Sequence, residues 1–341
     1  MNKSLRTLLF VLGGLLAAYG FYLLFWSLVF GARFDSLAVA AEARAKQPKY
    51  IIDADTANEV DDLFAIVGAM ARDNRYNYEE PLLVGLTSAQ FHSSPLASDT
   101  TARESHAINQ RLVELMYAPV PVYLGSDLPL TNHTTPQISP ASNFIAEQAR
   151  TANTEQKLDV FILGSCTNVA SAILQDANII PKLHVHYLGF WYDPLTSLYD
   201  KNEFNTGNDT LALNLLLNTP NLAFTVMTAT TSQALQMQRS DLDTKLLQDS
   251  PVTQFLKDRW DTYHRWWTEK DPEKRQWTMW DIASLEAWFE PQLATLESRP
   301  APADNVARNI QVYTAIDSAA MLENYFAVVD SSLRFFQEAI K

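Results

Sequence analysis

From Tyr50 onward, short apolar runs alternate with amphipathic stretches of helical period. The apolar runs predict strands at Tyr50–Ile52, Leu82–Leu86, Val120–Leu124, Leu158–Leu163, Leu183–Phe190 and Leu222–Met227. The stretches between them predict helices at Asp62–Ala71, His106–Met116, Ser142–Arg150, Val169–Gln175 and Asp209–Leu217. This alternation favours an α/β fold with an open, mostly parallel sheet flanked by helices in three Rossmann-like layers. Beyond Asp241 the pattern predicts mainly helix.

The N-terminal segment differs from the rest because it carries no charged residue from Thr7 to Ala32. As a helix rising about 1.5 Å per residue, its apolar part Leu8–Phe30 would span a hydrocarbon core of roughly 30 Å. A cleavable signal peptide with Ala38-Val39-Ala40 as its cleavage site is the alternative. Signal peptides usually have a shorter apolar region, which favours an uncleaved anchor.

The sequence therefore predicts a membrane anchor with one transmembrane helix at 1–32, a linker at 33–48 and a single domain at 49–341. Lysine and arginine flank the apolar segment on both sides, so the positive-inside rule does not decide its orientation. We expect a single-pass membrane protein whose domain lies on the periplasmic or another extracytoplasmic side.

The charge balance excludes one class of partner. The chain has 26 basic and 39 acidic side chains, a formal net charge of −13, and no basic stripe, so nucleic acid is not an expected ligand. Cys166 is the only cysteine, which excludes a disulfide within the chain. The sequence leaves a homo-oligomer open.

The strongest chemical signal follows the first predicted strand. Asp53, Asp55, Glu59, Asp61 and Asp62 stand within ten residues, and the stretch holds no lysine or arginine. Carboxylates this close repel one another unless a cation lies among them, and a hard divalent ion prefers oxygen ligands. A helix N-terminus would explain Asp61 and Asp62 through the helix dipole, but not Asp53 and Asp55. In open α/β sheets, ligands bind at the carboxyl ends of strands, where this cluster begins.

The segment Asp53-Ala54-Asp55, a short loop, and Asp61-Asp62 opening a helix resembles the signature of the inosine–uridine-preferring nucleoside hydrolases. The loop is longer here than in the commonest form of the family. Further segments resemble the family in the expected order: Leu86–His92, Val120–Gly125, Leu163–Ala170, Glu203-Phe204-Asn205 with Asp209, and Trp280–Ala283.

The resemblance implies a calcium ion held by Asp55, Asp62, the backbone carbonyl of Thr167 and Asp281, with Asp53 supporting these ligands or also approaching the ion. It implies that Asp55 accepts the proton of the attacking water. The expected reaction is calcium-dependent hydrolysis of the N-glycosidic bond of a ribonucleoside or related N-ribosyl compound, giving ribose and free base.

The resemblance also implies which residues bind the substrate, a small nucleoside-like molecule. Asp61 and Asn205 would hold ribose hydroxyls and Glu203 the 5′ side. His92 stands in place of an asparagine expected to touch ribose. Trp280 stands where many members carry a histidine that assists the leaving base, and it is the best candidate for stacking on that base.

These departures leave two alternatives. The chain could be a membrane-tethered ribosyl-binding relative with weak or no activity. A more remote alternative is a phosphatase of the haloacid dehalogenase type, because Asp53-Ala54-Asp55 follows a strand. Ala57 stands where that family has threonine or valine, and no later lysine and acidic pair is evident.

Two other groups have structural explanations. The late aromatic residues Trp260, Tyr263, Trp266, Trp267, Trp277 and Trp280 favour core or lid packing, with a base-stacking wall as the alternative. His184 and His186 alternate along a predicted strand. No cysteine or glutamate partner indicates a transition-metal site, so we expect a structural role for both.

Overall fold

The computed structural model describes residues 47–75, 81–95, 97–264 and 270–340. The predicted membrane anchor lies outside the described residues, as do Trp266 and Trp267. Within the described ranges, no helix combines the length and the apolar character needed to cross a membrane.

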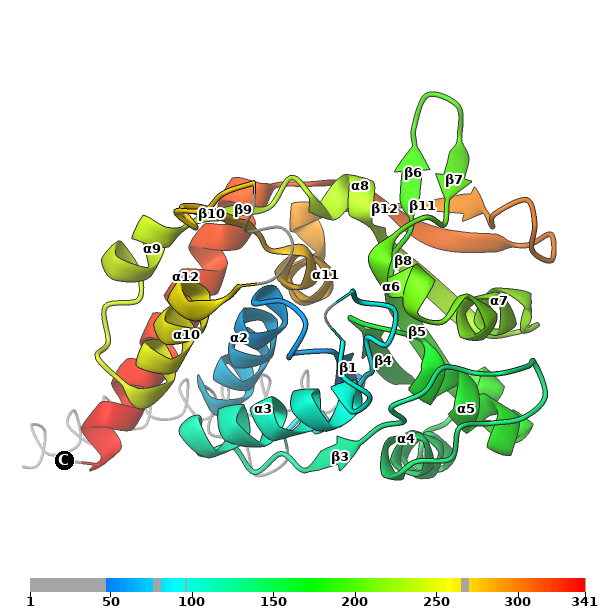
Figure 1. Ribbon diagram of the computed structural model, residues 1–341, viewed down its shortest axis with the longest axis horizontal. Helices are drawn as coiled ribbons and strands as arrows, with labels where there is room; N and C mark the ends of the chain where they lie inside the picture. The colour runs from blue at the N-terminus through cyan, green and yellow to red at the C-terminus, as the bar shows by residue number, and fades with distance from the viewer. Residues whose placement is uncertain (1–46, 76–80, 96, 265–269, 341) are drawn as a thin grey trace, which may run out of the picture. The chain divides into compact units, whose positions relative to one another are not determined.

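An eight-stranded sheet forms the centre of the unit Pro48–Lys341 (Figure 1). Its strand order is β11-β12-β8-β5-β4-β1-β2-β3. All neighbours pair in parallel except β11 and β12, which are antiparallel. The strands are β1 (Tyr50–Ala54), β2 (Leu83–Ser88), β3 (Val122–Leu124), β4 (Leu158–Ile162), β5 (Leu183–Gly189), β8 (Ala223–Thr228), β11 (Ala294–Pro300) and β12 (Asn309–Ile316). The predicted mostly parallel α/β sheet is confirmed.

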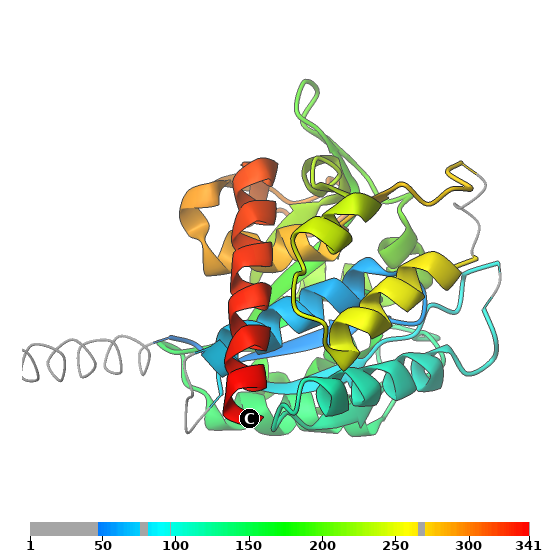
Figure 2. The ribbon, with the colours of Figure 1, turned by 90° about the vertical axis from the view of Figure 1, so that its left-hand side faces the viewer.

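Helices cover both faces of the sheet and bury two hydrophobic clusters. One face packs against α2 (Asp61–Arg75), α3 (Thr101–Leu115), α11 (Trp280–Phe289) and α12 (Ser318–Ile340). The other packs against α4 (Pro140–Thr151), α5 (Thr167–Gln175) and α7 (Thr210–Asn218). Figure 2 shows α12, in red, crossing in front of α2. Every residue of β1 is buried because β1 lies between β2 and β4 with helices on both sides, which explains its continuous apolar pattern.

Shorter elements complete the fold. A hairpin of β6 (Trp191–Asp193) and β7 (Leu198–Asp200) projects beyond the sheet (Figure 1). The remaining elements are the 3₁₀ turns η1 (Ala177–Lys182) and η3 (Pro291–Leu293), the helices α6 (Phe204–Asn208), α8 (Ala229–Ser232), α9 (Arg239–Thr244) and α10 (Pro251–Thr262), and the paired strands β9 (Gln236–Gln238) and β10 (Gln276–Thr278).

Beyond Asp241 the chain is mainly helical, as expected, through α10, α11 and α12, but this expectation missed the strands β10, β11 and β12. Ile310 and Val312 of β12 are buried while Asn309 and Gln311 are exposed, so this strand carries a period-2 pattern. The edge strand β11 has no buried residue and therefore no such pattern. It is a strand because it hydrogen-bonds to β12, which is a tertiary effect.

The strand order reverses between β1 and β4. From β1 the chain continues outward to β2 and β3 on one side, and later strands β4, β5 and β8 extend the other side. Loops leaving the carboxyl ends of β1 and β4 diverge at this point and leave a crevice, which is where open α/β sheets bind their ligands.

Candidate active site and metal centre

A cavity of about 350 Å³ opens at the carboxyl ends of the central strands. Its size lies within the range of small-molecule pockets. The lining combines six carboxylic acids with aromatic side chains and one lysine: Asp55, Glu59, Asp61, Asp62, Glu203, Asp281, Trp191, Phe204, Trp280 and Lys270. Segments far apart in the sequence supply these groups, so the fold assembles the acidic wall.

Three of the acids meet where two helices begin. Asp61 and Asp62 lie in the first turn of α2, and Asp281 lies in the first turn of α11. One carboxylate oxygen from each lies within 4.8 Å of the others, and all three residues are buried. The backbone N–H of Asp281 donates to Asp61 Oδ2 at 3.3 Å, which ties the two helix starts together. Helix N-termini favour negative charge, but not enough to offset three buried carboxylates.

Asp55 joins this group from the end of β1. Its carboxylate packs against Gly164, which follows β4; a Cβ atom on Gly164 would lie 2.7 Å from Asp55 Oδ1. Asp55 Oδ2 and Asp62 Oδ1 are both buried, and neither has a hydrogen-bond partner among the described residues. Buried oxygens of this kind are costly without a proton or a cation.

The electrostatics of the cluster agree with its geometry. Burial first, and then repulsion from Glu59 and Asp61, raise the pKa of Asp55 well above its usual value. Burial and repulsion from neighbouring aspartates likewise raise the pKa values of Asp62 and Asp281. Burial raises the pKa of Asp61 to about 6, although hydrogen bonds from the start of α11 oppose the shift. A divalent cation among these groups would favour their ionised forms.

The donor set fits calcium. Asp55, Asp62 and Asp281 offer hard carboxylate oxygens on one cavity, and Asp55 Oδ2 and Asp62 Oδ1 have no hydrogen-bond partner among the described residues. Asp61 lies in one group with Asp62 and Asp281, so it is adjacent to two of the predicted metal ligands.

Asp53 lies next to the cluster but does not line the cavity. Its Oδ1 accepts hydrogen bonds from Thr87 Oγ1 at 2.7 Å and from Asn168 Nδ2 at 2.9 Å. Burial raises its pKa to about 6 despite these bonds. Asp53 Oδ1 therefore joins β1 to β2 and to the start of α5, while its buried Oδ2 has no hydrogen-bond partner among the described residues. Whether Asp53 supports the ligands or also approaches the ion stays a prediction.

Thr167 opens α5 and is buried, but it is not among the lining residues. Its Oγ1 donates to Asp209 Oδ2 at 2.7 Å and accepts from Gln90 Nε2 at 3.2 Å. These bonds fix the β4–α5 turn, whose Gly164 contacts Asp55. A ligand role for the Thr167 carbonyl stays a prediction.

Asn205 and Glu203 both line the cavity, and both are held by backbone groups. Asn205 Nδ2 donates to the carbonyls of Leu163 at 2.8 Å and Leu188 at 3.1 Å, at the ends of β4 and β5. The Asn205 amide oxygen is left as the group that can accept from a hydroxyl.

Glu203 is the N-cap of α6. Its Oε1 accepts from the Asn205 N–H, and its Oε2 accepts from the Thr206 N–H, the Thr206 hydroxyl and the Phe190 N–H. With four donors already in place, Glu203 orders the wall of the cavity, a role that the sequence did not predict.

The two remaining residues that were predicted to contact the substrate, Trp280 and His92, differ in their position relative to the cavity. Trp280 lines the cavity, and its ring meets that of Trp191 edge to face, with centroids 6.0 Å apart and planes at 87°. The side chain of His92 is exposed and is not among the residues that line the cavity, and its contact with ribose stays a prediction.

Residues of the late aromatic segment contact the acidic loop between β1 and α2. Trp260, Tyr263 and Trp277 are buried and pack on one another, as core packing predicts. The Tyr263 hydroxyl donates to the Asn58 carbonyl at 2.8 Å, and Arg259 donates to the Ala57 carbonyl at 3.0 Å. No local sequence signal links α10 to this loop, because the contacts span about two hundred residues.

The close contact between Gly164 and Asp55 gives a direct test. In Gly164→Ala, the new methyl group would overlap the Asp55 carboxylate, and we expect base release to fall by about tenfold or more. Gly207→Ala is the matched control, since nothing lies within 4 Å of a Cβ there and alanine favours the helix. The measurement is the steady-state rate of base release by both variants and the wild type. A Gly164→Ala rate equal to that of Gly207→Ala would show that Asp55 is not held against Gly164.

A parallel sheet with buried carboxylates converging on a cavity at its switch point is the arrangement of a metal-dependent α/β enzyme. The family model described as inosine-uridine preferring nucleoside hydrolase matches residues 50–323. The chain belongs to this family of N-glycosyl hydrolases, as the sequence motifs predicted. The match also sets the phosphatase alternative aside.

Solved structures show the same fold. A purine-preferring ribonucleoside hydrolase from Gardnerella vaginalis has a TM-score of 0.64 at 17% identity, covering 84% of this chain and 99% of that one. A plant nucleoside hydrolase has a TM-score of 0.61 at 17% identity, covering 84% and 98%. An inosine-uridine preferring nucleoside hydrolase from Bacillus anthracis has a TM-score of 0.55 at 12% identity, covering 84% and 99%. No curated protein sequence matches the chain significantly.

Proposed function

We propose that this chain is a calcium-dependent ribonucleoside hydrolase that cleaves the N-glycosidic bond to give ribose and free base. Family membership supports hydrolysis of this bond in a small-molecule nucleoside. The observation that carries the proposal is the convergence of Asp55, Asp62 and Asp281 on one cavity, with two buried oxygens that lack partners among the described residues.

Asp55, Asp62 and Asp281 would hold the ion, with Asp61 beside them and the Thr167 carbonyl as a further ligand. When bound, calcium positions a water molecule and lowers its pKa. Asp55 would accept a proton from the attacking water as the water oxygen bonds to the anomeric carbon and the bond between that carbon and the base nitrogen breaks. The acidic wall stabilises the positive charge that develops on the sugar as the base departs.

The ribose is oriented by groups that the fold has already fixed. Asn205 offers its amide oxygen to a hydroxyl, because its amide nitrogen is bonded to the ends of β4 and β5. Asp61, in the first turn of α2, also lines the cavity and would hold a second hydroxyl. Glu203 keeps the Asn205 backbone in place and borders the 5′ side. A sugar held against several fixed groups loses little further entropy in reaching the transition state.

The base would lie against Trp280 and Trp191. The two rings meet edge to face, so one indole can offer its flat face to the base. Stacking on an aromatic face depends little on which base is bound, because every base has a π-face. Lys270 is a basic residue among the described residues of the lining and would meet a leaving base that carries negative charge. These features favour a purine or pyrimidine as the leaving group.

We further propose that 1–32 anchors the enzyme to a membrane with its domain on the extracytoplasmic side. The uncharged segment Leu8–Phe30 supports this assignment. A homo-oligomer stays a prediction from the sequence.

The test is base release from a panel of inosine, uridine, adenosine, cytidine and nicotinamide riboside by the full chain, in membrane and soluble fractions. We expect hydrolysis of at least one compound with calcium, loss after chelation and recovery on adding calcium back, all in the membrane fraction. Calcium and ribose binding without release of any base would instead support a non-catalytic ribosyl-binding relative. Activity only in the soluble fraction would contradict the anchor but not the reaction.

A further inference from the structure

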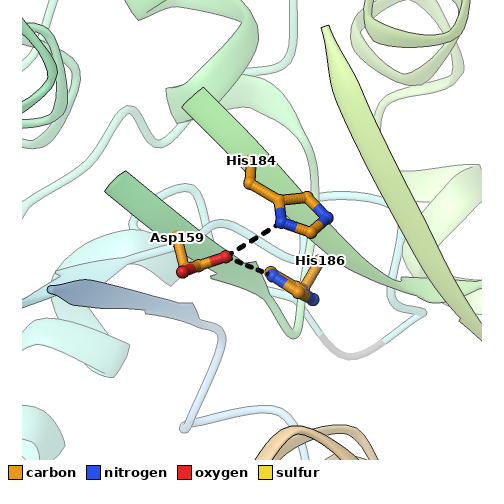
Figure 3. A group of neighbouring side chains, drawn as sticks. All are labelled: Asp159, His184 and His186. Carbon is orange, nitrogen blue, oxygen red and sulfur yellow. Dashed lines mark hydrogen bonds and ion pairs between the residues drawn. The ribbon is translucent and has the colours of Figure 1, made fainter. Parts of the chain in front are cut away.

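A second group of metal-type ligands lies on the sheet itself. It consists of Asp159 on β4 and of His184 and His186 on β5 (Figure 3). The two histidines alternate along β5 and so project from the same face, and the parallel register places Asp159 beside His184. None of the three lines the nucleoside cavity, which lies at the carboxyl ends of the same strands. The structure therefore supplies the acidic partner that the sequence did not reveal for these histidines.

The three donor atoms converge. Asp159 Oδ1 lies 2.6 Å from His186 Nε2 and 3.1 Å from His184 Nδ1. One ligand atom from each of the three residues lies within 4.8 Å of the other two. Figure 3 shows both rings turned toward the same carboxylate oxygen. Ligand atoms in a tetrahedral zinc shell are about 3.4 Å apart, given bonds of about 2.1 Å. Small side-chain movements would thus place one ion between them.

Neighbouring groups hold both rings in place. His184 Nε2 lies 2.8 Å from Thr225 Oγ1 on β8, the kind of outer hydrogen bond that fixes the tautomer of a metal-binding histidine and leaves Nδ1 as the ligand. Phe161 stacks on His186 with centroids 4.6 Å apart and planes at 15°. Asp159 and His186 are buried, whereas the side chain of His184 is 31% exposed, which gives an ion a path from solvent.

The protonation states agree with this geometry. Burial and the neighbouring His184 lower the pKa of His186 to about 4, so its ring is neutral near pH 7. Burial alone would raise the pKa of Asp159, but hydrogen bonds from both histidines hold it below its usual value. A neutral imidazole and an ionised carboxylate are the forms that bind metal.

We propose that Asp159, His184 and His186 form a binding site for a divalent transition metal of the zinc class, separate from the aspartate centre. Two imidazole nitrogens and one carboxylate favour zinc over calcium, whereas the oxygen-only aspartate centre favours calcium. The two sites therefore select different ions by ligand type. An ion here links β4 to β5 directly and stabilises the folded chain through binding.

The competing explanation is a hydrogen-bonded network in which each ring donates a proton to Asp159. Equilibrium dialysis against Zn²⁺ separates the two, using the full chain without a polyhistidine tag and excess Ca²⁺ to fill the aspartate centre. The wild type should retain one Zn²⁺ per chain, and Co²⁺ in its place should give visible absorption of a nitrogen- and oxygen-ligated ion. His184→Ala should weaken Zn²⁺ binding by about tenfold or more.

His133→Ala is the matched control because it removes an exposed histidine from a loop far from β4 and β5 in the sequence. Asp159→Asn keeps the volume and removes the charged ligand, so it provides a second variant should His184→Ala be unstable. Retention of tight Zn²⁺ binding in both site variants, or no binding by the wild type, would overturn the proposal. Base release with Ca²⁺ alone is measured separately and does not depend on this result.

Discussion

Replacing Asp55 with asparagine is expected to lower the rate of base release by about 10³-fold or more while leaving the fold intact. Asparagine keeps the shape that packs against Gly164 but cannot accept a proton from water at neutral pH. It also removes one carboxylate from a buried cluster of like charges. The metal-free variant should therefore melt at a temperature about 2–4 °C above that of the metal-free wild type.

The opposite signs of these two effects make the test specific. A substitution that damaged the fold would lower both the rate and the melting temperature. Asp99→Asn, at an exposed position before α3, is the control and should change neither. The measurements are the rate of free-base release with calcium and the melting temperature without calcium, for both variants and the wild type. An Asp55→Asn enzyme with nearly the wild-type rate would remove Asp55 from the mechanism.

The stabilisation by calcium is expected to grow as the pH rises. In the metal-free protein, burial raises the pKa of Asp61 from 3.8 to about 6, and raises those of Asp55, Asp62 and Asp281 well above their usual values. The folded state then binds more protons than the unfolded state above about pH 4, so the free energy of unfolding falls as the pH rises. For Asp61 alone the loss is about 3 kcal/mol once the pH has passed its folded pKa.

Bound calcium favours the ionised carboxylates and so removes most of this dependence. Melting temperatures measured from about pH 5 to about pH 8 should therefore diverge, with the calcium-loaded protein increasingly more stable than the chelated one. Sodium chloride at matched ionic strength controls for screening. Parallel curves for the two forms would mean that the ion does not bind among these carboxylates.

Local patterns predicted six of the eight strands of the main sheet and the acidic character of the site. β1 is recognisable because a central parallel strand is buried on both faces and must be apolar throughout. Asp61 and Asp62 can be assigned to the site from the sequence because only one short loop separates them from the end of β1. Their pairing with Asp281, more than two hundred residues later, was found through the resemblance of a short motif, since nothing local joins α2 to α11.

Other parts of the site could not be predicted in this way. Glu203 was expected to bind substrate, yet four backbone and hydroxyl donors engage its carboxylate. His92 comes four residues after the end of β2, and its side chain is exposed. Asp159 stands in an apolar run, and its meeting with His184 depends on the register of β4 against β5.

The amino-acid sequence by itself determined where the buried central strands and the helices between them form and where the chain concentrates negative charge. These properties depend on residue type and on spacings of a few residues along one segment. The tertiary structure alone decided which distant side chains share a cavity, which are already bonded to the backbone, and which histidines meet an aspartate. The physical reason is that strand order and register, set by burial over the whole sheet, fix those distances, and no local segment carries that information.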